Sequence, residues 1–465
     1  MTPGPHRTLR RTLASMPSVP LFALALTTLA PGGCARKSRL DSAPLRSDRE
    51  SPRYAAGPTY AFVNGNWLAD GTFTPRSFYA VNGVLQSTAP ATLDSTIDLG
   101  GGFVIPPFGD AHTHNLDGAR NIDQIINAYM REGTFYVQVL TNYRSGADQV
   151  RSRFNRPCTL DVLYANGGIT GTRSHPFLAY EPRALGIYQF DQWRARAAEI
   201  WKSRIGEDDV YWFVDSQSDL EAKWPKILAG GPDLVKIFLL DASETSVPPP
   251  ADSTLKSGHG LKPSVVPAIV RRAHAAGLRV AAHVETARDF EIAVDAGVDL
   301  FAHVPGYEMD PEAAPSSVLI SDAAARKAGA RGVVVIPTAS LTSLVSGPAD
   351  SAQVAARRVD LVRQNLRMLM RHGVRIAVGS DWYGQTAARE FAALNRLGLW
   401  DSRQLLDLWS ETTPQSMFPR RRIGRLTDGY EASFLVLRAN PLTDSTALST
   451  ITTRVKQGCI VHQGI

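Results

Sequence analysis

Residues 104–114 read Val-Ile-Pro-Pro-Phe-Gly-Asp-Ala-His-Thr-His, an apolar run that ends in a His-x-His pair. The run predicts a β-strand with His112 and His114 at its end. Side chains at positions i and i+2 of a strand point to the same side, so both imidazoles can reach one metal ion. Such a pair also arises by chance on protein surfaces, and its significance depends on the rest of the chain.

Four more candidate metal ligands each follow an apolar, strand-like run: Lys236, His283, His303 and Asp381. Stretches with helical patterning separate these runs, and alternation of strands and helices is typical of parallel β/α proteins. Counting every such run predicts eight strands, at residues 103–109, 134–140, 161–165, 234–240, 279–283, 299–303, 332–337 and 374–380.

Eight β/α units predict an α/β fold with a closed (β/α)8 barrel of the TIM type over residues 103–423. In such a barrel the chemistry lies at the C-terminal ends of the strands. The candidate ligands fall at or near the ends of the first, fourth, fifth, sixth and eighth strands. One site can therefore collect them all.

Both flanks of the predicted barrel carry β signals. Residues 58–102 contain Asn-Gly and Asp-Gly pairs between apolar runs, which are hairpin signals, and residues 424–465 contain similar short apolar runs. Neither segment can bury an apolar face alone. We therefore expect the two chain ends to form one small β-sandwich.

The N-terminus explains the basic character of the chain. The formal net charge is +6, and the excess lies within residues 1–57, so the remainder is formally neutral and predicts no nucleic-acid-binding face. Residues 1–33 combine arginines with an apolar stretch too short to span a membrane, which is typical of a signal peptide. Residues 34–57 lack apolar periodicity and predict a flexible tether.

The run Leu-Ala-Pro-Gly-Gly before Cys34 resembles a bacterial lipoprotein processing site. We expect Cys34 to be lipidated and the protein to be periplasmic, held at the outer membrane only through this anchor. Cleavage of an ordinary signal peptide nearby is the alternative, because Pro31 stands where an aliphatic residue is more usual. Cys158 and Cys459 show no spacing pattern, and we expect each to be an unpaired thiol.

A long insertion, residues 166–233, separates the third and fourth predicted strands. Most of its aromatic side chains are expected to pack its helices onto the barrel. Its first part reads Asn-Gly-Gly-Ile-Thr-Gly-Thr-Arg-Ser-His-Pro and leaves a strand at the catalytic end. This part is therefore positioned to cover the site.

The ordered set His-x-His, Lys, His, His, Asp resembles the metal ligands of the amidohydrolase superfamily. The branch that looks most similar contains imidazolonepropionase and the metal-dependent prolidases. Supporting phrases are Gly379-Ser-Asp381 and the stretches 293–303 and 424–437. The resemblance extends over about residues 58–465.

This resemblance implies a site for two divalent ions, which we expect to be zinc because His-rich sites with carboxylate ligands suit it. One ion would be held by His112, His114 and Asp381, the other by His283 and His303, and Lys236 would bridge them as a carbamate. Burial of Lys236 favours the neutral amine that reacts with carbon dioxide.

The resemblance further implies a hydrolase that cleaves an amide-type C–N bond in a peptide-like or cyclic amide. A metal-bridging hydroxide would attack, with Asp381 as general base and then general acid.

Two other functions stay open. Mononuclear deaminases or cyclic-amidine hydrolases of the superfamily usually carry His-x-x-Glu after the fifth strand. Here Glu285 follows His283 by only two positions, so we expect Glu285 to point away from the proton-shuttle position. A non-catalytic binding barrel is the remote alternative, because such relatives lose ligands and all six are present here.

The partner is expected to be a small molecule, in a pocket that mixes aromatic and polar side chains. Residues that follow predicted strands and would contact it are Asn142, Tyr143, His259, Glu285, Thr286, Tyr307, Thr338, Trp382 and Tyr383.

Overall fold

The computed structural model describes residues 57–244, 257–309, 313–343 and 352–461. The predicted signal peptide and Cys34 lie outside these residues, as does the predicted tether except for its last position. Among the described helices, none has both the length and the apolar character needed to cross a membrane.

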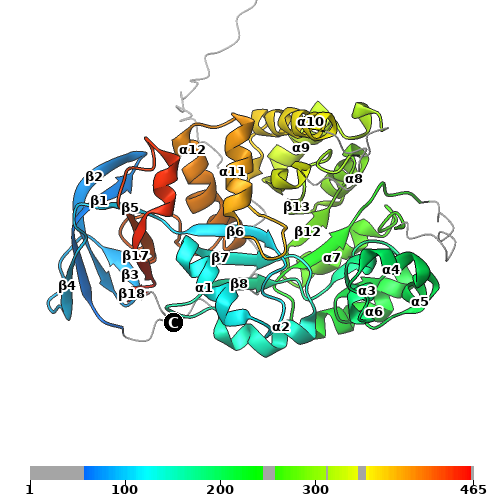
Figure 1. Cartoon of the computed structure of the whole chain (residues 1–465), viewed down its shortest axis with the longest axis horizontal. Coiled ribbons are helices and arrows are strands. Elements are labelled where there is room, and N and C mark those ends of the chain that lie inside the picture. The colour runs from blue at the N-terminus through cyan, green and yellow to red at the C-terminus, as the bar shows by residue number, and fades with distance from the viewer. Residues whose placement is uncertain (1–56, 245–256, 310–312, 344–351, 462–465) are drawn as a thin grey trace, which may run out of the picture. The chain divides into compact units, whose positions relative to one another are not determined.

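Strands from both chain ends share one eight-stranded sheet, seen at the left of Figure 1. Its path is β18-β17-β16-β5-β1-β2-β3, with β4 also paired to β1. The strands are β1 (Tyr60–Ala69), β2 (Thr72–Val81), β3 (Val84–Gln86), β4 (Ser95–Asp98), β5 (Phe103–Ile105), β16 (Phe434–Leu437), β17 (Ile451–Lys456) and β18 (Cys459–Ile460).

The two chain ends are joined by apolar packing as well as by strand pairing. The Phe434 ring lies 4.8 Å from that of Phe62 and 5.0 Å from that of Trp67, and all three side chains are buried. Each end thus covers an apolar face of the other, as predicted. Hydrogen bonds join these strands into a single sheet, so their description as a two-layer sandwich stays a prediction.

The central strands are parallel and form two sheets. The first has the order β6 (Phe108–Thr113), β7 (Thr134–Val139), β8 (Asp161–Tyr164). The second has the order β10 (Tyr211–Phe213), β9 (Gly168–Thr170), β11 (Val235–Phe238), β12 (Val280–His283), β13 (Leu300–Ala302), β14 (Val334–Ile336), β15 (Arg375–Ile376). Seven of the eight predicted strands are confirmed within their predicted bounds, whereas β9 and β10 were not predicted.

The first predicted strand, 103–109, is wrong as a single element. Residues 103–105 form β5 of the chain-end sheet, and β6 begins only at Phe108. Pro106 and Pro107 lie between them and have no N–H to donate to a ladder, so the strand breaks there.

Backbone hydrogen bonds connect the two parallel sheets on both sides. The N–H of Ala111 in β6 donates to Val378 O (2.9 Å), just after β15. On the other side, the N–H of Asp233 donates to Tyr164 O (2.8 Å) at the end of β8.

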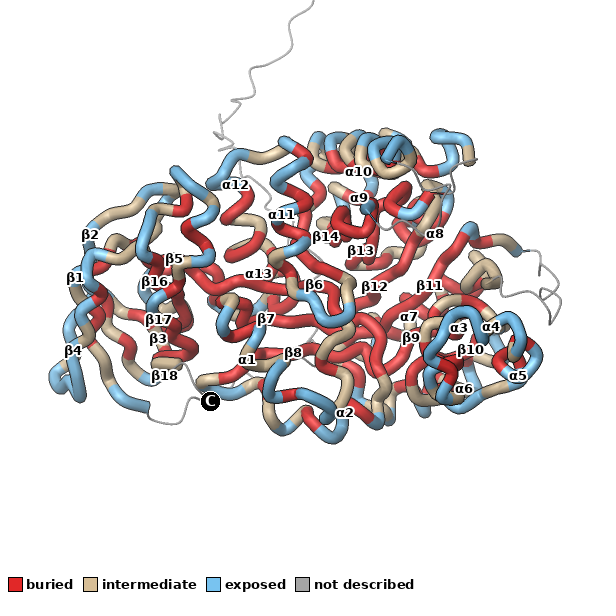
Figure 2. Tube along the Cα trace, viewed as in Figure 1, coloured by how far each residue is buried: buried red, intermediate tan, exposed pale blue. Residues whose placement is uncertain are grey.

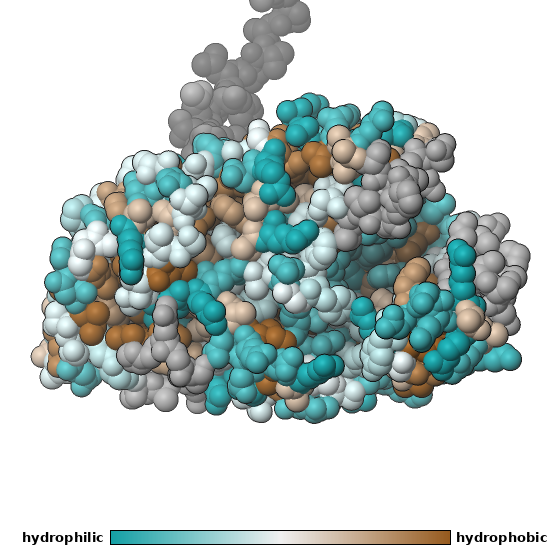
Figure 3. Space-filling model, in the orientation of Figure 1, coloured by the Kyte–Doolittle hydropathy of each residue, from teal (hydrophilic) through white to brown (hydrophobic). Residues whose placement is uncertain are grey.

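Helices follow the parallel strands and bury one face on them, while their outer faces stay exposed (Figure 2). They are α1 (Ile122–Glu132), α2 (Arg144–Val150), α6 (Gln217–Ala229), α7 (Val266–Ala275), α8 (Ala287–Ala296), α9 (Asp322–Arg331), α10 (Ala352–Arg371), α11 (Ala388–Leu397), α12 (Ser402–Asp407) and α13 (Thr413–Met417). The insertion contributes α6 and three further helices, α3 (Phe177–Ala184), α4 (Phe190–Ala195) and α5 (Ala197–Lys202). The face seen in Figure 3 is largely hydrophilic, with hydrophobic residues scattered between.

A buried ion cluster joins the chain-end sheet to the parallel strands. Asp161 of β8 forms ion pairs with Lys456 Nζ of β17 (2.8 Å) and with Arg421 Nη2 (2.7 Å), and both Asp161 and Lys456 are fully buried. Arg421 also pairs with Glu431, which accepts a hydrogen bond from Tyr136 (3.1 Å). Every charge in the cluster has an opposite partner, which is the condition for burying charges without a large cost.

Next to this cluster, Cys158 and Cys459 form a disulfide with a Cα–Cα distance of 5.5 Å. The prediction of two unpaired thiols is therefore wrong. The two residues are 301 positions apart, and only the packing of β18 beside the segment before β8 brings them together.

Replacing both Cys158 and Cys459 by Ser should lower the free energy of unfolding by about 2–5 kcal/mol, because the cross-link restricts the unfolded chain. Urea denaturation without reductant measures the change. Reductant should destabilise the wild type and leave the double variant unaffected. Equal denaturation midpoints for the two proteins would show that the bond contributes no stability.

Candidate metal centre

Five of the six predicted ligands lie at or beyond the C-terminal ends of parallel strands, and Lys236 lies within such a strand. His112 lies within β6 and His114 follows it, while His283 ends β12. The other three are Lys236 in β11, His303 just after β13, and Asp381 in the segment that follows β15. This placement is the one that the predicted β/α architecture requires.

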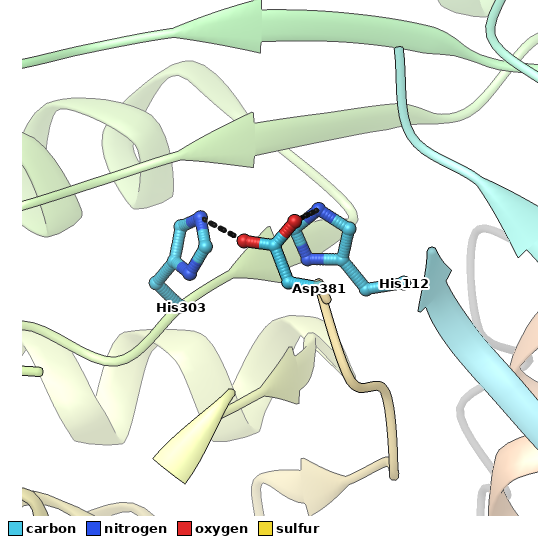
Figure 4. A group of neighbouring side chains, drawn as sticks. All are labelled: His112, His303 and Asp381. Atoms are coloured by element: carbon cyan, nitrogen blue, oxygen red, sulfur yellow. Dashed lines mark ion pairs between the residues drawn. The ribbon is translucent and has the colours of Figure 1, made fainter. Parts of the chain in front are cut away.

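The Asp381 carboxylate lies among three imidazoles. Its Oδ1 is 3.2 Å from His112 Nε2 and 2.9 Å from His114 Nε2, and its Oδ2 is 3.7 Å from His303 Nε2. Figure 4 shows His112 and His303 pointing at this carboxylate from either side. Ligand atoms of His112, His303 and Asp381 all lie within 4.8 Å of one another, close enough to hold a metal ion.

The backbone is strained where it presents two of these ligands. His303 has a φ of 79° and Asp381 a φ of 52°, in the left-handed region that favours glycine. Gly379, two residues before Asp381, allows the chain to approach β6, because a Cβ at this position would lie only 2.6 Å from the backbone nitrogen of His112. In the sequence Gly379-Ser380-Asp381, the glycine therefore allows close packing against β6, and the aspartate is the predicted ligand.

Asp110 holds the segment that contains Ser380 close to β6. It is fully buried and accepts hydrogen bonds from the His112 N–H (3.2 Å), the Ser380 N–H (3.2 Å) and the Tyr129 hydroxyl (3.2 Å). Burial raises the pKa of Asp110 to about 7. Asp110 thus ties the two ligand-bearing segments together without being positioned as a ligand itself.

Neighbouring groups set the direction of two imidazoles. The Thr338 hydroxyl donates to Pro337 O (2.7 Å), so its oxygen accepts from His303 Nδ1–H (2.7 Å). The lone pair of His303 Nε2 then faces the Asp381 carboxylate. His114 Nδ1 lies 2.8 Å from Thr141 O, which turns its Nε2 toward the same carboxylate. A lone pair facing a carboxylate is favourable only with a cation between them, so these residues fit a metal ion.

Burial favours the neutral form of the imidazoles of His112, His283 and His303. Burial, together with nearby Lys236, lowers the pKa of His283 to about 3. Burial likewise holds the pKa values of His112 and His303 well below their usual range. Neutral imidazole is the form that binds metal ions.

Lys236 has the same buried environment. Its side chain is 1% exposed, and its Nζ has no hydrogen-bond partner among the described residues. Burial lowers the pKa of Lys236 to about 7, although nearby Asp381 opposes the shift. An unpartnered buried amine is costly, which indicates that this nitrogen interacts with a group that a protein chain alone does not supply.

Comparison with known proteins identifies the fold. No family model and no curated protein matches the chain. Among solved structures, an amidohydrolase has a TM-score of 0.65 at 20% identity, covering 86% of this chain and 98% of its own. A Xaa-Pro dipeptidase with bound methionine in its active site gives 0.63 at 19%, covering 86% and 99%, and the A. niger ochratoxinase gives 0.65 at 16%, covering 87% and 96%.

The chain has the amidohydrolase fold. At these identities the likeness concerns the fold alone.

Within this amidohydrolase fold, His175 is a site residue to which the sequence analysis assigned no role. It follows β9 in the insertion, and its ring stacks on that of His283 at 4.9 Å and lies 5.1 Å from that of Phe238. The sequence signal for His175 was its position in residues 166–176, the segment expected to leave a strand at the catalytic end of the barrel. The first part of the insertion therefore reaches a predicted metal ligand.

Glu285 lies next to a predicted ligand, and the expectation that it does not fill the proton-shuttle position stays a prediction. Its Oε1 lies 3.4 Å from His283 Nε2. Strand β12 ends at His283, so the alternation of a regular strand no longer governs the direction of Glu285. Burial raises the pKa of Glu285 to about 7.

The predicted substrate residues divide into two groups. Those in direct contact with predicted ligands are Glu285, Thr338, Tyr307, stacked on His303 at 4.3 Å, and Tyr383, stacked on His114 at 5.5 Å. The others have different partners: Asn142 bonds Asn166, Tyr143 packs on Tyr180, His259 bonds Asp241 O, Thr286 caps α8, and Trp382 lies under Arg389. Their role toward substrate stays a prediction.

Thr338→Val should weaken metal binding by about 10–100-fold, because His303 loses the acceptor that orients its Nε2. Titration with a chelator of known affinity measures this without a substrate. The matched control is Thr342→Val in the 3-10 turn (Ala339–Ser343) that follows Thr338, where the hydroxyl donates to Ala339 O. Equal metal affinity in both variants would contradict the orienting role.

Proposed function

We propose that this protein is a metal-dependent hydrolase that cleaves an amide-type C–N bond in a small peptide-like or cyclic amide. The observation that carries the proposal is the Asp381 carboxylate between His112, His114 and His303. The amidohydrolase fold supports it, and so does the unpartnered amine of Lys236. We further propose that the two parallel sheets form one closed (β/α)8 barrel, because hydrogen bonds connect them on both sides.

The donor set suits two divalent ions, which we propose to be zinc. His112, His114 and Asp381 would hold one ion, and His283 and His303 the other. Lys236 would join the two sites as a carbamate, formed when its neutral amine adds to carbon dioxide and releases one proton. When bound, the ions supply an activated water and polarise the substrate carbonyl.

The protein's own residues perform the remaining steps. Asp381 is positioned to accept a proton from the attacking water and to return it to the leaving nitrogen. His175 and Tyr307 stack on His283 and His303 respectively and form walls beside the reacting carbonyl. These walls limit the access of bulk water, which strengthens electrostatic interactions within the site.

One observation favours a second candidate, a mononuclear deaminase or cyclic-amidine hydrolase. Glu285 lies beside His283, where it could transfer a proton to substrate nitrogen. Elemental analysis after loading with zinc and bicarbonate separates the two: about two ions per chain support the binuclear hydrolase, and one supports the alternative.

We also propose export, with Cys34 as a lipid anchor. The Cys158–Cys459 disulfide supports an oxidising compartment such as the periplasm, because structural disulfides are rare in the cytosol.

Asp381→Asn should slow turnover by about 10²–10⁴-fold, the range for loss of a general base, because an amide cannot accept the proton. The measurement is single-turnover hydrolysis of any substrate found in a screen of dipeptides, N-acyl amino acids and lactones. Metal content should fall less than in His112→Ala, since the Asn carbonyl can still ligate weakly. A rate within about threefold of wild type would overturn the assignment of the base.

Lys236→Ala should lose the second metal ion together with most activity, because no carbamate can form. Added short-chain carboxylates are expected to restore part of the rate by replacing the carbamate. Metal content by elemental analysis checks the first point independently of any substrate. Full metal content in Lys236→Ala would exclude the bridging role.

A further inference from the structure

Residues 186–205 of the insertion expose several large hydrophobic side chains to solvent. Five such side chains are exposed among the described residues, and three of them, Tyr188, Phe190 and Ile205, lie in this segment. Tyr188 and Phe190 are the most exposed of the five, at 77% and 76%. Single exposed hydrophobic residues need no explanation, whereas a concentration of them marks an interaction surface.

Helix α4 presents aromatic and basic side chains together. It is the one α-helix among the described residues in which no residue is buried, so packing on a core does not account for its composition. Trp193 Nε1 donates to Ile187 O (3.4 Å), and the rings of Phe190 and Trp193 lie 4.8 Å apart. Phe190 and Arg194 are four positions apart and share a helix face. Tyr188, Phe190, Trp193 and Arg194 are called the aromatic–basic patch below.

The patch belongs to a group of helices that contacts the candidate metal centre. Helix α5 packs on both α3 and α4, and the three lie side by side (Figure 1). In α3, Tyr180 donates to Thr141 O (3.2 Å) and lies 3.5 Å from His114 Nδ1. The Cζ of Arg183, in the last turn of α3, lies 5.0 Å from the centre of the Tyr383 ring. A surface bound at the patch would therefore be held near the site.

The charge of the segment identifies the class of its partner. Residues 183–205 contain five basic and two acidic side chains, within a body that is formally neutral from residue 58 onward. Arg196 forms an ion pair with Glu199 (2.7 Å). Arg194 and Lys202 are exposed, and among the described residues no ion pair involves either of them. Exposed aromatic side chains beside unpaired basic ones are typical of segments that lie in an anionic membrane surface.

The exposed area is too small for a stable contact with a second protein chain. One aromatic side chain buries about 150–250 Å² when fully covered, so Tyr188 and Phe190 together offer roughly 300 Å². A stable protein interface needs about 800 Å² from each partner. A bilayer has no such threshold, because apolar burial and attraction to anionic lipids add to each other there.

We propose that the aromatic–basic patch binds the surface of an anionic phospholipid bilayer. Tyr188 and Phe190 enter the headgroup region, and Arg194 contacts lipid phosphates. The candidate metal centre is then held next to that surface by α3. This inference is independent of the proposed hydrolysis and does not require lipidation at Cys34.

Hydrogen–deuterium exchange in the full chain with Cys34→Ala tests the proposal, because it reports on the patch separately from the N-terminus. Amides of residues 186–205 should exchange more slowly with phosphatidylglycerol vesicles than with phosphatidylcholine vesicles. Phe190→Ser should raise the lipid concentration that gives half-maximal protection by about tenfold, the effect of losing one buried aromatic side chain. Arg194→Gln should raise it by about fivefold, as expected for one basic residue at an anionic surface.

Matched control variants lie in residues 58–102, away from the insertion. Leu93→Ser and Arg76→Gln each remove an exposed side chain of the same kind and should leave the protection of residues 186–205 unchanged. Circular dichroism checks that all variants are folded.

Four results would overturn the proposal. They are equal protection by both kinds of vesicle, protection by inorganic phosphate alone, unchanged protection in folded Phe190→Ser, and protection without lipid when the protein concentration is raised. The last result would assign the patch to contact between two copies of the chain.

Discussion

A carboxylate surrounded by three imidazoles is the constraint on which the rest of this structure depends. Asp381 lies within 3.7 Å of three imidazole nitrogens, and at least one of these, on His303, directs a lone pair at it. Such an arrangement fits a cation between these groups. The left-handed backbone at His303 and Asp381, the close approach at Gly379 and the buried Asp110 all maintain this geometry.

Stability is concentrated at the opposite end of the strands. The ion cluster of Asp161, Arg421, Glu431 and Lys456 connects the chain-end sheet to the parallel strands, and the Cys158–Cys459 disulfide lies beside it. None of these groups contacts a predicted metal ligand in the described structure. The strain at the ligands can therefore be supported by a scaffold whose strongest cross-links are separate from the chemistry.

The insertion supplies side chains that surround the site. The parallel strands supply the predicted metal ligands, whereas α3 and the segment before it supply His175, Tyr180 and Arg183. A division in which a rigid scaffold holds the chemistry and a connecting segment selects the substrate is expected when one fold supports many reactions. The low identity to other chains of this fold is consistent with such divergence.

The sequence by itself determined seven of the parallel strands and the candidate ligands in or after them. Apolar periodicity and strand-end position are local properties, so His112, His283 and Asp381 could be assigned from their immediate neighbours. Even the break at Pro106–Pro107 was local, and it was missed because the apolar run continues across it. Only the tertiary structure decided which distant residues meet. The disulfide across 301 positions, the stacking of His175 on His283, the turn of Glu285 toward the site and the contact of Arg183 with Tyr383 all depend on packing between segments, whose relative positions no local pattern encodes.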